Sequence, residues 1–322
     1  MLRRMAERPR LVAPPSIVVV GDLMLDVSIA PREALRSGTD VPGAVRLRQG
    51  GSAASTARWV ARLGARSSLI CAVGRDAIGR ALVQELRDEA VRVRAFRARD
   101  ARTGRIGVIV AADGERSFVA DRGAADALPA EWLDPAWFAA ADAVHLPAYS
   151  LLGEPLGIAG RRAAELARAA GARISVDLAS AGPLLAAGRA AAQDLIGAVA
   201  PDLLLATESE AAALTGGSTF HDLLEDLLEL APLLVIKRGA RGASVIARSA
   251  SGPQRFEVPA RPVVAADTTG AGDAFDAGFL VRWLAAPDPA SMATLRSAAR
   301  TANRTARRQL TGLHRESATL VG

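Results

Sequence analysis

The sequence contains one cysteine, Cys71, and one lysine, Lys237, among its 322 residues. A single cysteine excludes an internal disulfide, and the apolar run around Cys71 indicates a small buried side chain. Aromatic residues make up only 4% of the chain, and we find no apolar run long enough to cross a bilayer. The first residues are basic but lack the hydrophobic stretch of an export signal, so we expect a cytoplasmic protein without membrane contacts.

The chain carries many charged residues of both signs, and the basic residues exceed the acidic residues only slightly. The chain has 40 Lys and Arg residues against 34 Asp and Glu residues, a net charge of +6 that is spread along the sequence. No stretch combines clustered basic residues with aromatics, as a nucleic-acid surface would require, so we expect no nucleic-acid partner. Half of the residues are apolar, which is enough for a large core and excludes global disorder.

Short β-branched or leucine-rich runs alternate with alanine-rich helical patterns. Residues 16–20 predict a buried strand that ends at Gly21, and residues 50–64 predict a helix that begins with glycines. Further strands are expected at 68–73, 143–146, 172–177, 202–206 and 232–237, and further helices at 77–89, from near Gly272, and from about 289 to 308. This alternation predicts a mainly parallel sheet with helices on both faces.

Two regions break this rhythm because apolar and polar residues alternate in them. They are residues 41–48 and a pair of runs, 106–111 and 117–120, whose connection at Asp113-Gly114 indicates a hairpin. Strands with one apolar face predict a small sheet that stands off the main body as a lid. We find no low-complexity linker. We therefore expect a flexible basic tail at 1–15 and a single domain at 16–322, with lid strands inserted at about 28–49 and 103–121.

The segment DTTGAGDAF places glycines directly before an aspartate, Asp273, where a helix is expected to begin. The free N–H groups of Gly270, Ala271 and Gly272 and the helix dipole would favour an anion there. A phosphoryl group in transit fits this place, with Asp273 kept ionised by the dipole and ready to accept the proton of an attacking hydroxyl. The alternative is that Asp273 caps the helix and the glycines form a tight turn.

Other phosphate-binding patterns are not found. The sequence has no G-x-x-x-x-G-K-[ST] motif, and no G-x-G-x-x-G motif follows the first strand. A Walker-type site and a Rossmann dinucleotide site are therefore disfavoured.

The run DTTGAGDAFDAGFL resembles the carboxy-terminal signature of the ribokinase-like, or PfkB, carbohydrate kinases. Four more segments match that family in order: Gly21-Asp22 with Asp26, Gly50-Gly51, VGRDAIG, and KRGARG at 237–242. The resemblance covers residues 16 to about 310. It implies a three-layer αβα sandwich with a mainly parallel central sheet and a small β-sheet lid. It also implies ATP as donor, Mg²⁺ as helper and, as in some relatives, activation by a monovalent cation.

The resemblance also implies roles for individual residues. Asp273 would be the catalytic base, and the amides of Gly270, Ala271 and Gly272 would form the anion hole. The substrate-binding residues would be Asp22, Asp26, Gly50, Gly51 and Ser55. The nucleotide-binding residues would be Thr207, Lys237, Gly239, Gly242 and Asn303, and Glu210 would organise Mg²⁺ through waters.

Simpler interpretations of several of these residues remain open. Asp26 fits a cap of the turn after the first strand, and Gly50-Gly51 fits a plain helix start. Glu210 fits an exposed helix acid, and Lys237 with Arg238 fits a solvated basic turn.

Three residues depart from the family pattern. Thr207 replaces the usual asparagine of the N-x-x-E segment, Ser55 replaces an asparagine common in sugar kinases, and Met24 replaces a polar residue typical of ribokinase. Two polar sugar contacts are thereby shortened or lost, which argues against a strict ribokinase. Met24 would offer an apolar surface to a flat acceptor such as a nucleoside, or else it points into the core.

We therefore predict an ATP-dependent kinase that phosphorylates a primary hydroxyl of a small sugar or ribosyl compound. Candidate sugars are ribose, fructose and 2-keto-3-deoxygluconate. The alternatives are a nucleoside kinase, such as a pseudouridine kinase, and a catalytically quiet sugar- or nucleotide-binding regulator. A sugar phosphate would need a cationic pocket, for which Arg46, Arg105 and Arg122 are ambiguous evidence. The resemblance also implies a homodimer formed through the lid strands, whose edges invite pairing.

Overall fold

The computed structural model describes residues 13–110, 116–217, 220–265 and 267–312. Within these ranges the central sheet has nine strands in the order β13-β12-β11-β10-β9-β8-β1-β4-β5. The strands are β1 Ser16–Val20, β4 Arg66–Gly74, β5 Arg92–Ala98, β8 Ala143–Pro147, β9 Arg173–Asp177, β10 Leu203–Thr207, β11 Leu233–Lys237, β12 Ala243–Ala247 and β13 Gln254–Val258. Neighbours pair in parallel except β11 with β12 and β12 with β13, so the prediction of a mainly parallel sheet is confirmed.

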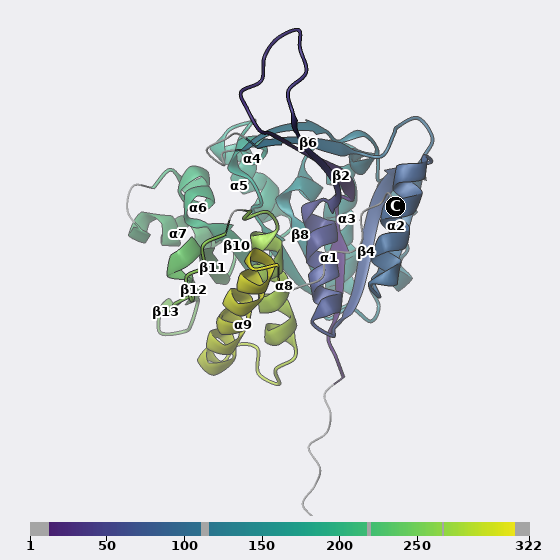
Figure 1. Ribbon diagram of the computed structural model, residues 1–322. Coiled ribbons are helices and arrows are strands. Elements are labelled where there is room, and N and C mark those ends of the chain that lie inside the picture. The colour runs from purple at the N-terminus through teal and green to yellow at the C-terminus, as the bar shows by residue number, and fades with distance from the viewer. Residues whose placement is uncertain (1–12, 111–115, 218–219, 266, 313–322) are drawn as a thin grey trace, which may run out of the picture.

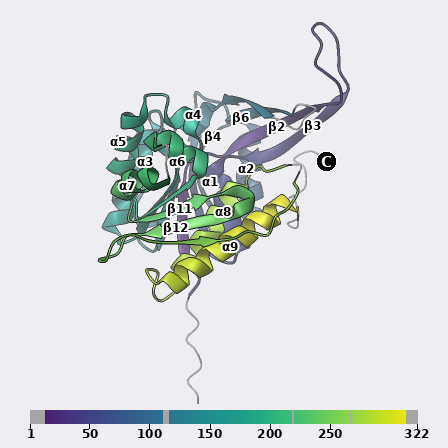
Figure 2. The same cartoon turned by 90° about the vertical axis from the view of Figure 1, so that its left-hand side faces the viewer.

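Helices cover both faces of this sheet (Figures 1 and 2). The α-helices are α1 Ser52–Arg62, α2 Ala77–Asp88, α3 Leu156–Ala169, α4 Ala181–Leu184, α5 Arg189–Ala198, α6 Glu208–Thr215, α7 Phe220–Leu230, α8 Ala271–Leu284 and α9 Met292–Leu310. One hydrophobic cluster joins α1, α2, α8 and α9 to one face of the sheet. A second cluster joins the five helices from α3 through α7 to the other face. The three-layer αβα arrangement predicted from the sequence is therefore confirmed.

Strand β1 explains why the run SIVVV is apolar at nearly every position. Ile17 and Val19 belong to the cluster on one face of the sheet, whereas Val18 and Val20 belong to the cluster on the other. Successive side chains of a strand point to opposite faces, and here both faces are covered by helices.

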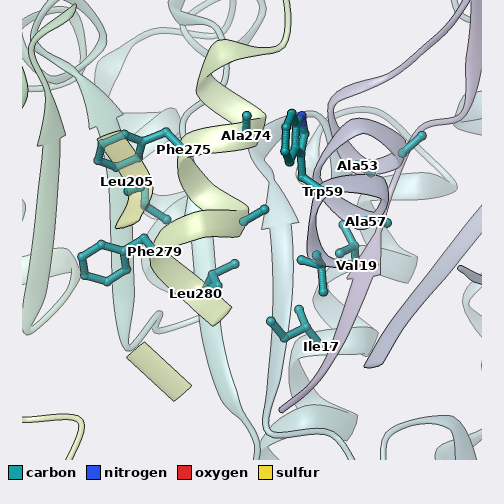
Figure 3. Close-up of a cluster of buried hydrophobic side chains, with 14 of the residues drawn as sticks. Ile17, Val19, Ala53, Ala57, Trp59, Leu205, Ala274, Phe275, Phe279 and Leu280 are labelled. Carbon is teal, nitrogen blue, oxygen red and sulfur yellow. The ribbon is translucent and has the colours of Figure 1, made fainter. Parts of the chain in front are cut away.

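Helix α8 lies against α1 on one face of the sheet (Figure 3). In that view Ala274 of α8 faces Trp59 of α1, while Phe275 and Phe279 point toward Leu205 of β10. All of these side chains are almost completely buried. This packing fixes the start of α8 beside the start of α1.

A second sheet stands over one end of the first (Figures 1 and 2). Its four strands in the described residues are β3 Gly43–Gly50, β2 Met24–Pro31, β6 Arg105–Val110 and β7 Arg116–Asp121, in that order. The predicted fold class with a small β-sheet lid is confirmed. Residues 1–12 of the tail predicted at 1–15, and the turn at Asp113-Gly114, lie outside the described residues.

Strand β2 was not predicted, because its sequence MLDVSIAP does not alternate strictly between apolar and polar residues. No described helix combines the length and the apolar character that crossing a bilayer requires.

The end of α2 provides a stability prediction. Exposed Ala90 has φ 62, and the bonds Ala90 N–H to Arg87 O (3.0 Å) and Val91 N–H to Leu86 O (3.0 Å) form a Schellman motif. Glycine adopts this left-handed conformation without a Cβ penalty, so Ala90→Gly is expected to increase the free energy of unfolding by about 1 kcal/mol. Denaturant unfolding measures this change.

The matched control for Ala90→Gly is Ala81→Gly in the interior of α2. There the same change is expected to lower the free energy of unfolding by about 1 kcal/mol. Equal effects of the two substitutions would contradict the conformational explanation.

Candidate active site

The lid faces the edge of the central sheet where four parallel strands end. Asp22 follows β1, Asp177 ends β9, Thr207 ends β10 and Lys237 ends β11. In open α/β sheets ligands bind beyond the carboxyl ends of the strands. This edge, together with the start of α8, contains the predicted catalytic residues.

The first turn of α8 is open toward this edge. Gly270 is the N-cap in the left-handed region, with φ 73, and the amide of Ala271 donates to Thr268 O at 3.2 Å. Among the described residues, the amides of Gly270, Gly272 and Asp273 have no hydrogen-bond acceptor. Apart from α8 itself, a Cβ added at Gly272 would meet only Lys237 Nζ, at 3.6 Å. Three N–H groups are therefore free at this helix start, with open space beside Gly272, and the amide of Ala271 serves the turn.

Asp273 lies partly buried at the start of α8. The pKa of Asp273 is raised to about 8, mainly by burial and next by the charge of Asp177, while the Lys237 ammonium opposes this rise. Contrary to the expectation that the helix dipole keeps Asp273 ionised, burial and the neighbouring Asp177 carboxylate favour the protonated form of Asp273. The hydroxyl of Ser52, at the start of α1, hydrogen-bonds Asp273. Sequence reasoning missed Ser52, because only the packing of α1 on α8 brings it there.

Lys237 is buried between two carboxylates. Its Nζ lies 2.6 Å from Asp177 Oδ1 and 3.1 and 3.2 Å from the two carboxylate oxygens of Asp276. The alternative of a solvated basic turn is wrong for Lys237, which is 9% exposed. Sequence reasoning missed Asp177 and Asp276. The available sequence signals were that Asp177 ends a predicted strand, as Lys237 does, and that Asp276 lies one turn after Asp273 in the predicted helix.

The neighbouring basic residue of this loop, Arg238, is also paired. Its Nε lies 3.1 Å from Glu208 Oε1, and its Nη1 lies 2.6 Å from Glu257 Oε1. The guanidinium therefore links the start of α6 to β13.

Asp22 connects β1 to the start of α1. Its Oδ1 accepts from Ala53 N at 3.1 Å, and its Oδ2 lies 3.6 Å from Arg122 Nη1. Gly51 has φ 100, and a Cβ there would lie 2.6 Å from the backbone oxygen of Asp22. The helix start thus needs glycine at 51. Ser55 lies half-buried one turn further along α1.

Asp26 projects from the lid strand β2 toward Gly50. Its Oδ1 is buried and has no hydrogen-bond partner among the described residues. The pKa of Asp26 is raised to about 7, mainly by burial and next by the charge of Asp22, while Arg48 opposes this rise. A Cβ at Gly50 would overlap the Asp26 carboxylate, so glycine is required there. A buried oxygen without a partner is suited to a ligand hydroxyl.

Met24, which departs from the family pattern, lies two residues before Asp26 on β2 and is 1% exposed. It packs on Gly104, where an added Cβ would lie 2.9 Å from the Met24 Cγ.

Asp267 links the loop before α8 to the lid. Its Oδ1 accepts from Thr269 N at 2.9 Å, and its Oδ2 accepts from Arg48 Nη1 of β3 at 3.2 Å. The ion pair therefore joins two segments that are far apart in the sequence.

Thr207 and Glu210 form a capping box at the start of α6. Thr207 Oγ1 accepts from Glu210 N at 3.2 Å, and Glu210 Oε2 accepts from Thr207 N at 2.7 Å. Among the described residues, no three His, Cys, Asp or Glu side chains are grouped to hold a metal ion. Glu210 presents a single carboxylate at this point, and Mg²⁺ takes one or two carboxylates together with waters and substrate phosphates.

The remaining predicted nucleotide residues lie around the turn after β11 and on α9. Gly239 has φ 56, and a Cβ there would meet no atom within 4 Å. A Cβ at Gly242 would overlap Val258 O, so Gly242 is needed for close backbone packing. Asn303 Nδ2 on α9 donates to the same Val258 O at 3.1 Å. Open surface at Gly239 is therefore available to a ligand, whereas Gly242 and Asn303 brace the loop beside it.

Comparisons with known proteins agree with this geometry. Residues 14–312 match the family model described as "pfkB family carbohydrate kinase". A fructokinase of Klebsiella pneumoniae is 35% identical over 255 residues, covering 76% of this chain and 80% of that protein. Fructokinase-1 of Oryza sativa subsp. japonica is 34% identical over 285 residues, covering 86% of this chain and 84% of that protein.

Two solved structures have the same fold. A fructokinase with bound ATP from Xylella fastidiosa superimposes with a TM-score of 0.80 and 24% identity, covering 92% of each chain. An adenosine kinase from Sinorhizobium meliloti superimposes with a TM-score of 0.78 and 23% identity, covering 93% of this chain and 94% of that one.

Proposed function

Because the chain belongs to the pfkB family of carbohydrate kinases and is an ATP-dependent sugar kinase, we propose that it phosphorylates a primary hydroxyl of a small sugar or ribosyl compound. The observation that supports this most strongly is the start of α8, where free amides of Gly270 and Gly272 adjoin the Asp273 carboxylate. An anion site next to a base is what phosphoryl transfer to a hydroxyl requires.

In this proposal Asp273 accepts the proton of the acceptor hydroxyl as the phosphoryl group is transferred in line. The ionised form of Asp273 is the active form, since a protonated carboxyl cannot take up another proton. Ser52 holds the carboxylate in place through its hydrogen bond. The amides of Gly270 and Gly272 stabilise the charge that develops on the transferred group, and Ala271 shapes the turn that presents them.

ATP would supply the phosphoryl group, and Mg²⁺, when bound, would neutralise part of its charge. Gly239 and the loop after β11 offer open surface for the nucleotide, and Glu210 is the residue that would organise Mg²⁺ through waters. Activation by a monovalent cation is a further expectation. Turnover in potassium and in choline salts at equal ionic strength tests it.

The acceptor would bind beneath the lid, where Asp26 has a buried oxygen without a partner. Asp22, Gly50, Gly51 and Ser55 would complete this pocket as predicted. The curated relatives named above are fructokinases, which favours a keto sugar such as fructose as the acceptor.

Coupled ADP release with Mg-ATP across a panel of sugars, nucleosides and sugar phosphates tests the proposal. We expect ADP release that depends on a sugar with a primary hydroxyl. Release only with nucleosides such as pseudouridine would support the nucleoside kinase alternative. ATP binding without release for any acceptor would support the regulator alternative and contradict the proposal.

The substitution Asp26→Ala is expected to raise the acceptor KM about tenfold, because it removes a carboxyl group with an unpartnered buried oxygen, and to leave the KM for ATP nearly unchanged. Steady-state kinetics with each substrate varied in turn measures both constants. Ser28→Ala, two residues along the same face of β2, is the control and should change neither. An unchanged acceptor KM in Asp26→Ala would remove Asp26 from the acceptor site.

We also propose that the protein is a homodimer formed through the lid. Large apolar side chains are exposed on both edge strands of the lid: Val45 on β3 is 67% exposed, and Phe118 and Val119 on β7 are 61% and 66% exposed. Sedimentation velocity should show a dimer that Phe118→Asp weakens. A monomer at micromolar concentration would contradict this proposal.

A further inference from the structure

Lys237 is the only lysine of the chain. The chain has 40 Lys and Arg residues in total, and every one except Lys237 is arginine. It is also the cation nearest to the start of α8 in the contacts described above. Arginine is the usual choice for a buried ion pair, since its planar guanidinium matches a carboxylate. A compact ammonium group at this one position therefore needs an explanation.

The ammonium group is fixed beneath the first turn of α8. Asp177 from β9 and Asp276 from α8 hold it at 2.6 to 3.2 Å, and Asp276 is fully buried. The Nζ lies 3.6 Å from the place where a Cβ on Gly272 would be. Asp276 follows Asp273 by three residues, so the two carboxylates lie on the same side of the helix.

The charges around this point are mostly negative. Asp177, Asp276 and Asp273 surround Lys237, and Glu210 of α6 contributes a weaker attraction to its ammonium group. Asp22 also acts on Asp273. The charge of Asp276 is disfavoured by burial and by Asp177, which raise its pKa well above the usual value.

The fully buried His145 of β8 completes the groups that face Lys237. Burial lowers the pKa of His145 to about 4, so this side chain is neutral near pH 7. Lys237 is consequently the one positive side chain that the described contacts place against these carboxylates. Without it, an incoming phosphoryl group would meet only repulsion from side chains at this point.

We propose that Lys237 is a positioning residue of the phosphoryl transfer. It lies beneath α8 and supplies the positive charge that the anion hole and an ionised Asp273 both require. This inference rests on the proposed function. Lys237 acts through Asp276 and the first turn of α8, and it stays paired to Asp177. This role differs from the nucleotide-binding role that the family resemblance implied for Lys237.

The single lysine makes this inference testable without any turnover. Protein labelled with ¹⁵N and ¹³C only in lysine gives one side-chain NMR signal, from Lys237. We expect this signal to shift as the pH is raised through about 8, when Asp273 loses its proton, and we expect the shift to be lost in Asp273→Asn. His145 titrates near pH 4 and does not contribute in this range. No shift between pH 6.5 and 9.5, or the same shift in Asp273→Asn, would overturn the inference.

Kinetics of a charge-balanced variant provide the second test. Lys237→Met alone leaves two buried carboxylates uncompensated and is prone to unfold, whereas K237M/D276N keeps the net charge of the cluster. We expect the double variant to fold but to lose about 30-fold or more in kcat, with the KM for ATP changed by less than about threefold. The acid limb of its kcat/KM profile should move to higher pH, because Lys237 no longer offsets the effect of the Asp177 carboxylate on the pKa of Asp273.

A double variant with wild-type kcat and an unmoved acid limb would overturn the inference, since Lys237 would then serve only as the partner of Asp276. If the wild-type protein has no kinase activity, the proposed function fails. The NMR titration still decides whether Lys237 and Asp273 are coupled.

Discussion

Asp273→Asn is expected to reduce kcat about 1,000-fold while ATP binding stays nearly intact. The amide has the shape of the carboxylate but cannot accept the hydroxyl proton, and general base catalysis contributes about 100- to 10,000-fold. Coupled ADP release measures kcat, and equilibrium titration with ATP measures binding. A variant that retains more than about a tenth of the wild-type kcat would remove Asp273 from the role of base.

The stability of the same variant provides its control. The folded protein holds a proton on Asp273 up to about pH 8, whereas an unfolded chain releases that proton near pH 4. This group therefore makes the folded state less stable as the pH rises through that window. Asparagine carries no such proton, so at pH 9 the melting temperature of Asp273→Asn should be equal to or higher than that of the wild type. A lower melting temperature would show that the loss of kcat includes damage to the fold.

The pKa of Asp273 also predicts the wild-type pH profile. The kcat/KM for the acceptor should rise with pH through about 8, because only the ionised carboxylate acts as the base. A profile that is flat between pH 6 and 9 would contradict this assignment.

Gly278→Ala is expected to lower the free energy of unfolding by about 2 kcal/mol. Gly278 of α8 faces α9, where an added Cβ would lie 2.6 Å from Thr305 Oγ1 and 2.9 Å from Ala302 Cα. Thr305 cannot simply turn away, since it is buried and its hydroxyl donates to Thr301 O at 2.9 Å. The two helices must therefore separate slightly. Denaturant unfolding measures the loss of stability.

Gly197→Ala in α5 is the matched control for Gly278→Ala. Gly197 is exposed, and a Cβ there would meet only Leu230 Cδ2, at 3.8 Å. Alanine favours the helix over glycine, so this variant should gain about 0.5 to 1 kcal/mol. Changes of the same sign in both variants would contradict the packing argument.

Local sequence patterns were sufficient to predict much of the fold. The apolar runs that became β1, β4, β8, β9, β10 and β11 are short, lie between helical patterns and are buried on both faces, which is typical of a parallel sheet. The glycines before Asp273 predicted the start of α8 to within one residue of Ala271. The capping box of Thr207 and Glu210 was not predicted, although the sequence TESE has the required spacing.

The ion pairs of the site could not be predicted in the same way. Lys237 and Asp177 are 60 positions apart, and they meet because β9 and β11 end at the same edge of the sheet. Ser52 reaches Asp273 only through the packing of α1 on α8. The pKa of Asp273 depends on burial and on Asp177, which a sequence pattern does not show. Local patterns thus placed Asp273 at the start of α8 but could not predict its pKa.

The most direct test of the central claim is ³¹P NMR of a reaction of the protein with Mg-ATP and fructose. A phosphoryl group transferred to a primary hydroxyl gives a monoester signal that is split by two CH₂ protons. We predict that this signal grows as the γ-phosphate signal of ATP disappears. Growth of inorganic phosphate alone, or consumption of ATP at the same rate without any sugar, would contradict the assignment of the site around Asp273 to sugar phosphorylation.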